Sequence, residues 1–350
     1  MAVALYSSTP LIPGIPARHL QHVSLPVADS TQVAEARRSV AQRTAALRFS
    51  TRSGGEAAIV ATELAGNLVK HGGGGELLLR TIGDAQNPGI EMLALDRGRG
   101  MDVARCLVDG YSTAGSPGTG LGAIQRLSSS SDFYSVPDGG SAVLSKIWSG
   151  APPSNGTRWQ VGGINVPLPG EELSGDAWVI RCHDRGMDAM VVDGLGHGPE
   201  AAKAAAAAAA AFLASAGHSP SQHLRAAHDA LQSTRGAAMG VAVVNLQKSE
   251  IAFAGVGNTV AIVLTNDVPQ HLVSFGGIVG QRTIHVREFV SPWSQDSTFI
   301  AHSDGIATRW NLAAYPGLAG RHPSIIAGIL YRDFARGRDD ASILVVKPWQ

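Results

Sequence analysis

The run V-V-D-G-L-G-H-G, from Val191 to Gly198, constrains the fold most strongly, because an apolar β-like segment ends there in a carboxylate and a glycine-rich corner. An alanine-rich segment of helical character follows at once. Further acids lie beside short apolar runs, at Gly175-Asp176, Ser303-Asp304-Gly305 and Arg338-Asp339-Asp340. Carboxylates gathered from strand ends are typical ligands of hard cations such as Mg²⁺ or Mn²⁺. The pattern therefore predicts metal-assisted chemistry on phosphate.

Length and composition narrow the class of protein. A chain of 350 residues favours two domains, and a formal net charge of zero argues against a broad basic surface for nucleic acid or acidic lipid. Cys106 and Cys182 have no metal-ligand spacing, so a reducing compartment is the simplest setting. The proline-broken start is a poor signal peptide, and no apolar stretch reaches about 18 residues. We expect a cytoplasmic protein that binds neither nucleic acid nor membrane.

Turn-forming residues divide the chain. The segment S-G-A-P-P-S-N-G-T, residues 149–157, is typical of a linker. We therefore expect an irregular lead over 1–19, one domain over 20–148 and a second over 158–350. Helical spacing fits 31–48, 55–70, 101–109, a segment from Leu121, 199–216, 220–233 and 322–336, and β-like runs fit 76–82, 90–95, 132–136, 141–148, 159–166, 176–183, 188–193, 239–246, 250–255, 259–264, 297–302 and 341–347. This order predicts an α+β protein whose second domain is antiparallel or a sandwich.

Three motifs in the first domain indicate a nucleotide site. In E-L-A-G-N, Glu63 and Asn67 are four residues apart and share a helix face, where the amide oxygen could ligate Mg²⁺ and the carboxylate could act as a base. In L-A-L-D-R-G-R-G, Asp96 ends a strand and could accept from an adenine amino group. G-T-G-L-G, Gly118 to Gly122, leads into a helix whose N-terminus suits phosphate. Each motif alone is more often a solvated face or a turn; their order and spacing favour a site.

These motifs resemble the N, G1 and G2 boxes of the GHKL ATPase superfamily. The stretch D-G-Y-S-T-A-G-S-P-G-T-G-L-G-A-I-Q-R-L-S, Asp109 to Ser128, resembles the anti-sigma and stressosome switch serine/threonine kinases in particular. Over 20–148 the resemblance implies a Bergerat α/β sandwich that binds ATP with Mg²⁺ and phosphorylates a STAS-domain partner. Asn67 would be the metal ligand, Glu63 the general base and Asp96 the adenine contact. The nucleotide would also meet Gly98, Gly100, Gly118, Thr119, Gly120, Leu121 and Gly122.

The second acid set fits a two-metal site. Two divalent ions that share a bridging carboxylate can activate one water and offset charge on a phosphoryl group. Asp193 is the natural bridge, with the Gly194 carbonyl beside it, and Asp304 and Asp339 lie near other strand ends. Any one of these acids alone is better explained as a turn former. Four of them in glycine-flanked positions favour the metal site.

This half resembles the PP2C-type phosphatases of the SpoIIE branch. The resemblance rests on G-D-A-W, D-G-L-G-H-G, Gly257-Asn258, S-D-G and G-R-D-D-A-S-I-L-V-V, and it covers about 157–348. It implies an α-β-β-α sandwich with two Mn²⁺ or Mg²⁺ ions. Asp193, Asp304 and Asp339 would hold one ion, and Asp193, the Gly194 carbonyl and Asp176 the other. Asp340 matches a position that is usually not a ligand. His197 is left open between a catalytic acid and a structural role.

Together the two resemblances imply a bifunctional regulator of partner-switching signalling, in which a kinase-like domain and a phosphatase act on STAS-type antagonist or stressosome-like proteins. The alternative is a phosphatase whose first domain binds nucleotide and gates the second without transferring phosphate. Glu63 separates the two, because a pure binding module needs no base. A homodimer is left open, and the sequence does not choose between Mg²⁺ and Mn²⁺.

Overall fold

The computed structural model describes residues 4–7, 21–107, 120–153 and 158–349, and the described residues form three sheets. We call them the N-terminal, inner and outer sheets. The N-terminal sheet has the order β2 (Val23–Val27), β3 (Gly75–Gly83), β4 (Pro88–Leu95), β6 (Ser141–Trp148) and β5 (Ser130–Ser135). The inner sheet has the order β13 (Val268–Leu272), β12 (Val260–Thr265), β16 (Ser297–His302), β17 (Ala341–Pro348) and β7 (Trp159–Val166).

The outer sheet contains the first described strand of the chain beside strands of the second half. Its order is β1 (Ala4–Ser7), β8 (Asp176–His183), β9 (Gly186–Gly194), β10 (Ala237–Asn245), β11 (Glu250–Val256) and β14 (Ser274–Phe275), with β15 (Phe289–Pro292) also on β11. All pairings are antiparallel except β11 with β14. Residues Ala4–Ser7 were expected to be an irregular lead; they form a strand instead, because their backbone pairs with the edge of β8. The first described strand therefore belongs to the second half of the protein.

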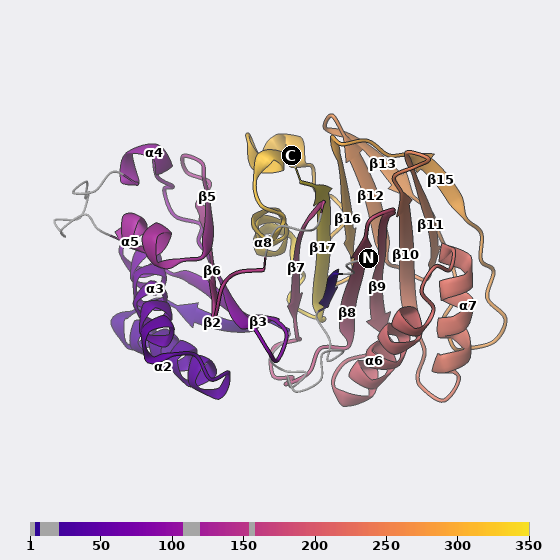
Figure 1. Cartoon of the computed structure of the whole chain (residues 1–350), viewed down its shortest axis with the longest axis horizontal. Coiled ribbons are helices and arrows are strands. Elements are labelled where there is room, and N and C mark those ends of the chain that lie inside the picture. Colours follow the sequence, from indigo (N-terminus) through magenta and orange to yellow (C-terminus); the bar gives the residue numbers. More distant parts are fainter. Residues whose placement is uncertain (1–3, 8–20, 108–119, 154–157, 350) are drawn as a thin grey trace.

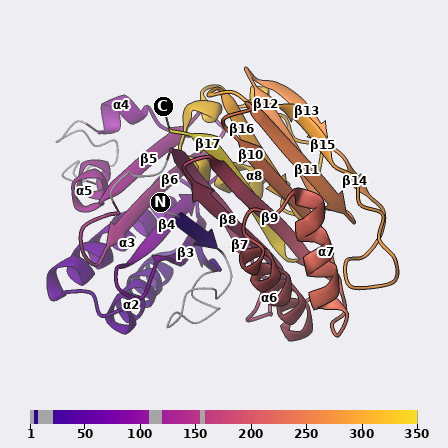
Figure 2. The ribbon, with the colours of Figure 1, turned by 45° about the vertical axis from the view of Figure 1, so that its right-hand side comes forward.

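Helices separate the sheets into layers (Figure 1). The helices are α2 (Ser30–Ala46), α3 (Thr51–Lys70), α4 (Val103–Cys106), α5 (Gly120–Leu127), α6 (Pro199–Ala214), α7 (Pro220–Leu231) and α8 (Pro323–Phe334), with 3-10 turns at Leu312–Ala314 and Leu318–Gly320. Helices α2, α3 and α5 lie on one side of the N-terminal sheet, and α6 and α7 cover the outer sheet (Figures 1 and 2). Because α8 packs on the inner sheet, the second half is an α-β-β-α sandwich, as the resemblance implied.

Helix α8 lies between the N-terminal and inner sheets and belongs to the core of both (Figure 1). One apolar cluster contains Leu93 and Leu144 from the N-terminal sheet, Ile325 and Ile329 from α8, and Ile343 from the inner sheet, all at most 1% exposed. Burial of apolar surface is the main driving force of folding. The two halves therefore share a hydrophobic core and are more than two domains joined by a linker.

A buried ionic cluster lies in this shared core. Glu91 on β4 is fully buried and accepts from Arg80 at 2.7 Å and from the Ser324 hydroxyl of α8 at 2.9 Å, and Lys146 lies 3.3 Å away. Burial alone would raise the pKa of Glu91, but Arg80 and Lys146 outweigh it and hold the pKa well below its usual range. The interactions of the buried Glu91 carboxylate therefore fix the position of α8 on the N-terminal sheet.

Local sequence explains where several helices begin. Asp29 and Gln32 form a reciprocal capping box at α2, and the Ser50 hydroxyl caps α3. Helix α3 ends at Lys70, and its C-cap His71 lies just before the Gly72–Gly75 cluster. Within the described ranges, no helix is both long enough and apolar enough to cross a membrane.

Candidate functional site

The structure brings the four predicted acids of the second half to one end of the β-sandwich. Asp193 is near the end of β9, and Asp176, at the start of β8, is its direct partner in the ladder. Asp304 follows β16, and Asp339 precedes β17. Each acid therefore extends from a strand end, and the set draws on both sheets of the sandwich.

Repulsion within this acid cluster is visible in the pKa values. Burial and then the Asp193 charge raise the pKa of Asp176 well above its usual range. Burial, followed by Asp304 and Asp339, raises the pKa of Asp193 to about 7. The pKa of Asp304 is raised for the same reasons, burial first and Asp339 second. A bound cation would remove this repulsion, because it replaces the protons that the carboxylates otherwise retain.

The carboxylates of this acid cluster are chemically suited to bind a divalent cation. Asp176 is 4% exposed, and its Oδ2 is buried without a hydrogen-bond partner, although a buried carboxylate oxygen normally has one. Among the residues described, however, no three or more His, Cys, Asp or Glu side chains are close enough to form a ready-made coordination shell. Mg²⁺ commonly keeps several waters and takes one or two carboxylates directly. A site built from these acids would therefore need water ligands or side-chain rotation.

Asp340 has a different role from its neighbour Asp339. Its Oδ1 accepts from the Leu168 amide and its Oδ2 from the Gly175 amide, both at 2.7 Å, and the residue is 2% exposed. Both carboxylate oxygens are thus used to hold the turn that carries Asp176. Burial raises the pKa of Asp340, against these two backbone bonds. Asp340, which matches a position that is usually not a ligand, therefore holds the backbone beside Asp176.

Other residues position the acids. The Asn258 side chain donates to Asp304 Oδ2 at 2.6 Å, and the Ser303 hydroxyl accepts from the Ser342 amide at 3.1 Å. His197, left open by the sequence, pairs through Nδ1 with Glu171 Oε1 at 2.7 Å, and its side chain is 56% exposed. The imidazole is therefore oriented by a carboxylate on another loop.

In the first half, the predicted base and metal ligand lie together. Glu63 and Asn67 are on α3, and a Cβ placed at Gly120, the first residue of α5, would be 3.1 Å from Glu63 Oε2 and 3.7 Å from Asn67 Oδ1. The glycine thus allows the N-terminus of α5 to approach both side chains closely. Leu121 and Gly122 follow on the buried face of α5. Gly118 and Thr119, also predicted to meet the nucleotide, lie outside the described residues.

Asp96 is at the end of β4, beside the C-terminus of α3. Its Oδ1 accepts from the Gly98 amide at 2.8 Å and from the Ser141 amide at 3.2 Å, and burial raises its pKa. A Cβ at Gly72 would lie 2.7 Å from the Asp96 Cβ, and one at Gly100, where φ is +72°, only 2.1 Å from the Val136 carbonyl. The glycines around Asp96 are therefore required by close backbone packing, in addition to any contact with a base.

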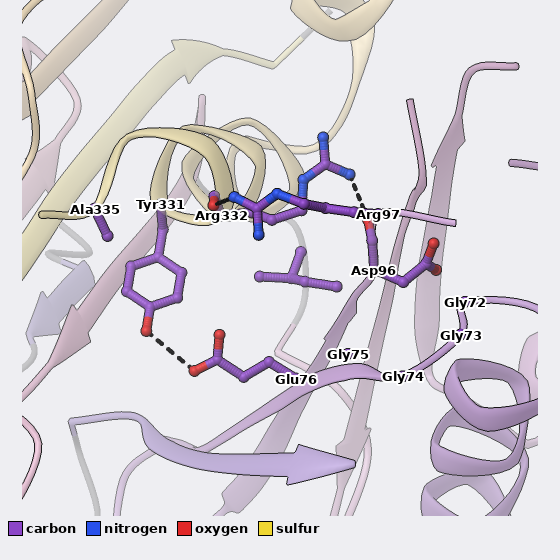
Figure 3. A pocket seen from close by; sticks show the side chains of 11 residues that line it. Gly72, Gly73, Gly74, Gly75, Glu76, Asp96, Arg97, Tyr331, Arg332 and Ala335 are labelled. Atoms are coloured by element: carbon purple, nitrogen blue, oxygen red, sulfur yellow. Dashed lines mark hydrogen bonds between the residues drawn. The ribbon is translucent and has the colours of Figure 1, made fainter. Parts of the chain in front are cut away.

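Helix α8 of the second half reaches the predicted adenine contact. The Arg332 Nη1 donates to the Asp96 carbonyl at 2.7 Å, and the Tyr331 hydroxyl donates to Glu76 at 3.0 Å (Figure 3). These residues line a cavity of about 480 Å³ between the Gly72–Gly75 loop and α8. No local sequence pattern indicates this contact, because Arg332 and Asp96 are 236 residues apart and neither residue type implies the other.

Comparison with known proteins supports the assignment of the second half. Residues 183–348 match the family model of Stage II sporulation protein E, SpoIIE. The matched residues make up just under half of the chain, and we call the β-sandwich that contains them the SpoIIE-type domain. The chain is also similar to a solved structure described as the bacterial stressosome, "a modular system that has been adapted to control secondary messenger signaling", at 27% identity and a TM-score of 0.50, over 54% of this chain and 99% of that one. A structure of the PP2C phosphatase domain and a regulatory fragment of SpoIIE from Bacillus subtilis is 19% identical, with a TM-score of 0.46, over 77% of this chain and 82% of that one.

A second relative is a kinase. Over 88 residues the chain is 31% identical to the serine/threonine-protein kinase RsbT of Bacillus subtilis (strain 168). The match covers 25% of this chain and 66% of the kinase, just short of two thirds of its length. It is a partial similarity, on which an activity for this chain can be proposed.

Proposed function

We propose that the SpoIIE-type domain is a metal-dependent phosphoserine/phosphothreonine protein phosphatase whose site is the acid cluster. The observation that carries the proposal is the convergence of Asp176, Asp193, Asp304 and Asp339 at one end of the sandwich, with the pKa of Asp193 raised to about 7. Bound Mg²⁺ or Mn²⁺ would supply an activated water and neutralise phosphoryl charge. Asp193 would contact both ions. Asp304 and Asp339 would help to hold one ion, and Asp176 and the Gly194 carbonyl would help to hold the other.

The chain's own residues would orient this chemistry. Asn258 holds the Asp304 carboxylate, and Asp340 holds the turn that precedes Asp176. Arg336 and Arg338 are exposed and near enough to lower the pKa of Asp304, against the larger effect of burial. They would attract the phosphate of a protein substrate towards the acids.

We propose further that the first half binds ATP with Mg²⁺ and transfers phosphate to a serine or threonine of a STAS-type or stressosome-like partner. Support comes from the grouping of Glu63, Asn67 and Gly120 and from the partial identity with RsbT. Asn67 would hold the Mg²⁺, Glu63 would accept the hydroxyl proton and Asp96 would accept from the adenine amino group. Positioning and charge neutralisation account for most of phosphoryl-transfer catalysis.

The contact between Arg332 and Asp96 favours a second candidate, in which the first half binds nucleotide and gates the phosphatase without transferring phosphate. A gate needs a physical link between nucleotide site and phosphatase, and this hydrogen bond joins the two. Both candidates require the same ATP-binding residues, and they differ in their need for Glu63.

The phosphatase assignment is tested with Asp193→Ala in the full chain, because the shared core argues against cutting the protein in two. We expect Mn²⁺-dependent hydrolysis of a phosphorylated STAS-domain protein to be abolished while the protein still binds ATP, since the proposed bridging ligand is lost. Metal-dependent hydrolysis at the wild-type rate would rule out the site.

The same Asp193→Ala protein tests the first half without interference from dephosphorylation. It is incubated with labelled ATP, Mg²⁺ and a STAS-domain protein, and compared with the Asp193→Ala/Glu63→Ala double variant. Label on the partner that disappears in the double variant supports phosphate transfer. Tight ATP binding with no label in either protein supports the gate.

A further inference from the structure

The C-terminal turn of α8 contacts the backbone of both candidate sites. On the side of the first half, Arg332 donates to the Asp96 carbonyl, and the Arg97 guanidinium donates in return to the Arg332 carbonyl. Arg97 also lies 3.4 Å from the Asp333 carboxylate. The loop that carries the predicted adenine contact is therefore held by two neighbouring residues of the phosphatase helix.

On the other side, the same turn binds the segment that carries Asp304. The Phe334 carbonyl accepts from the Ala307 amide, and the Arg336 amide donates to the Gly305 carbonyl, both at 2.8 Å. A Cβ at Gly305 would lie 1.9 Å from the Asp340 carbonyl, so this segment has no free space on its far side. A shift of the α8 terminus would therefore be transmitted to the backbone next to Asp304.

Arg332 is well suited to transmit such a shift. Its side chain is 6% exposed, and Nε and Nη2 donate to the two oxygens of Asp333 at 2.9 and 2.8 Å. The guanidinium is therefore fixed relative to its own helix, and its remaining bond reaches Asp96. A cavity of about 480 Å³ lies beside Tyr331 and Arg332 and leaves room for this contact between α8 and the Asp96 loop to rearrange. The polar side chains that line it, Glu76, Tyr331 and Arg332, are hydrogen-bonded to protein groups (Figure 3).

We propose that the segment Arg332–Arg336 couples the nucleotide site to the phosphatase site, with Arg332 as the positioning residue that reports the state of the Asp96 loop to Asp304. The inference rests on the proposed function, since it assumes ATP at Asp96 and hydrolysis at the acid cluster. A ligand that hydrogen-bonds to the Asp96 side chain changes the conformation of this loop, and the Asp96 carbonyl in the loop accepts from Arg332. Coupling of this kind is reciprocal, so metal at the acid cluster also changes nucleotide affinity.

The test compares two adjacent substitutions in the full chain. Arg332→Gln removes the bond to the Asp96 carbonyl. Tyr331→Phe is the matched control, because it removes a different bond between the halves, that to Glu76, and does not touch the Asp96 loop. For each protein, calorimetry gives the affinity for a non-hydrolysable ATP analogue with Mg²⁺. Hydrolysis of p-nitrophenyl phosphate with Mn²⁺ is measured without and with saturating analogue.

We expect the analogue to change the wild-type rate by about fivefold or more, the lower end of typical allosteric couplings. In Arg332→Gln the ratio of the two rates should fall to about one, and analogue binding should weaken about fivefold, whereas Tyr331→Phe should keep the wild-type ratio. Hydrogen exchange supplies a readout that needs no variant: analogue binding to the wild type should change the exchange rate of the Ala307 amide.

Two kinds of failure are distinguishable. If the wild type binds the analogue and hydrolyses the substrate, but Arg332→Gln keeps the full response, or Ala307 exchange does not respond to the analogue, the coupling is overturned and both sites stand. If the wild type binds no analogue or shows no metal-dependent hydrolysis, the proposed function fails, and the coupling with it.

Discussion

At the scale of single residues, Asp193 is a carboxyl group that the fold holds in an unfavourable charged environment. It is inside an acid cluster, and burial together with Asp304 and Asp339 raises its pKa to about 7. In the unfolded chain the same group titrates near its ordinary value of 3.8. The metal-free protein therefore holds a proton there that the unfolded chain releases, and its stability depends on pH.

The sign of this dependence follows from linkage. Between pH 4 and pH 7 the folded state binds more protons at Asp193 than the unfolded state does, so the free energy of unfolding should decrease as the pH rises through this range. Asp193→Asn removes the titrating group and should flatten the profile. Urea unfolding in EDTA at a series of pH values measures both. The same slope in the wild type and in Asp193→Asn between pH 4 and pH 7 would contradict this prediction.

At the scale of elements, the helices, the central strands and the edge strands β5 and β7 could be predicted from the sequence, whereas the other edge strands could not. The apolar runs at 90–95 and 341–347 correspond to β4 and β17, which have neighbours on both sides. The strands missed in the sequence are β1, β2, β13, β14 and β15, and all lie at sheet edges. Pro26 in β2 and Pro269 in β13 weaken the pattern there, and an edge strand tolerates proline because one side of its backbone makes no ladder bonds.

In the candidate sites too, residues with a local sequence pattern could be predicted and a long-range contact could not. Sequence patterns identified Asp176, Asp193, Asp304 and Asp339 because each acid adjoins a strand with its own local signal, and the structure brings them to one place. The helix spacing of Glu63 and Asn67 was equally local. Arg332 was missed, because its importance comes from where the whole of α8 packs, and no short-range pattern encodes that contact.

Gly328 is the element-level feature that permits this packing. A Cβ at Gly328, in the middle of α8, would be 2.6 Å from Leu93 Cδ2 on β4. Gly328→Leu should therefore destabilise the protein by about 1–3 kcal/mol through overpacking between helix and N-terminal sheet. Gly55→Leu is the control, because Gly55 is also helical but has open space around it, and there the substitution should be neutral or stabilise by up to about 1 kcal/mol. Thermal unfolding compares the two, and equal effects would contradict the assigned contact.

At the scale of the whole molecule, the shared core should make the two halves unfold together. The apolar cluster around α8 takes side chains from the N-terminal sheet, α8 and the inner sheet, and Glu91 is buried where they meet. Neither half can lose its structure without exposing part of the core of the other. Size alone would favour separate domains, but burial in this interface opposes it.

Calorimetry checks this expectation. We expect a single transition whose van't Hoff and calorimetric enthalpies agree, and we expect Mn²⁺ and an ATP analogue each to raise the midpoint of that same transition. The rise should increase with ligand concentration, by roughly 2.7 kcal/mol of stability at a hundred times the dissociation constant. Two separate transitions, of which each ligand shifts only one, would show that the halves are thermodynamically independent.

The pairing of β1 with β8 has a topological consequence. Because Ala4–Ser7 joins the outer sheet and β7 begins the inner sheet, the chain enters the SpoIIE-type domain before residues 21–148 and returns to it afterwards. The first half is thus an insertion between two strands of the SpoIIE-type domain, and it is connected to that domain at both ends. A single proteolytic cut in either connection would leave the inserted half attached by the other, and its release as a free fragment requires two cuts.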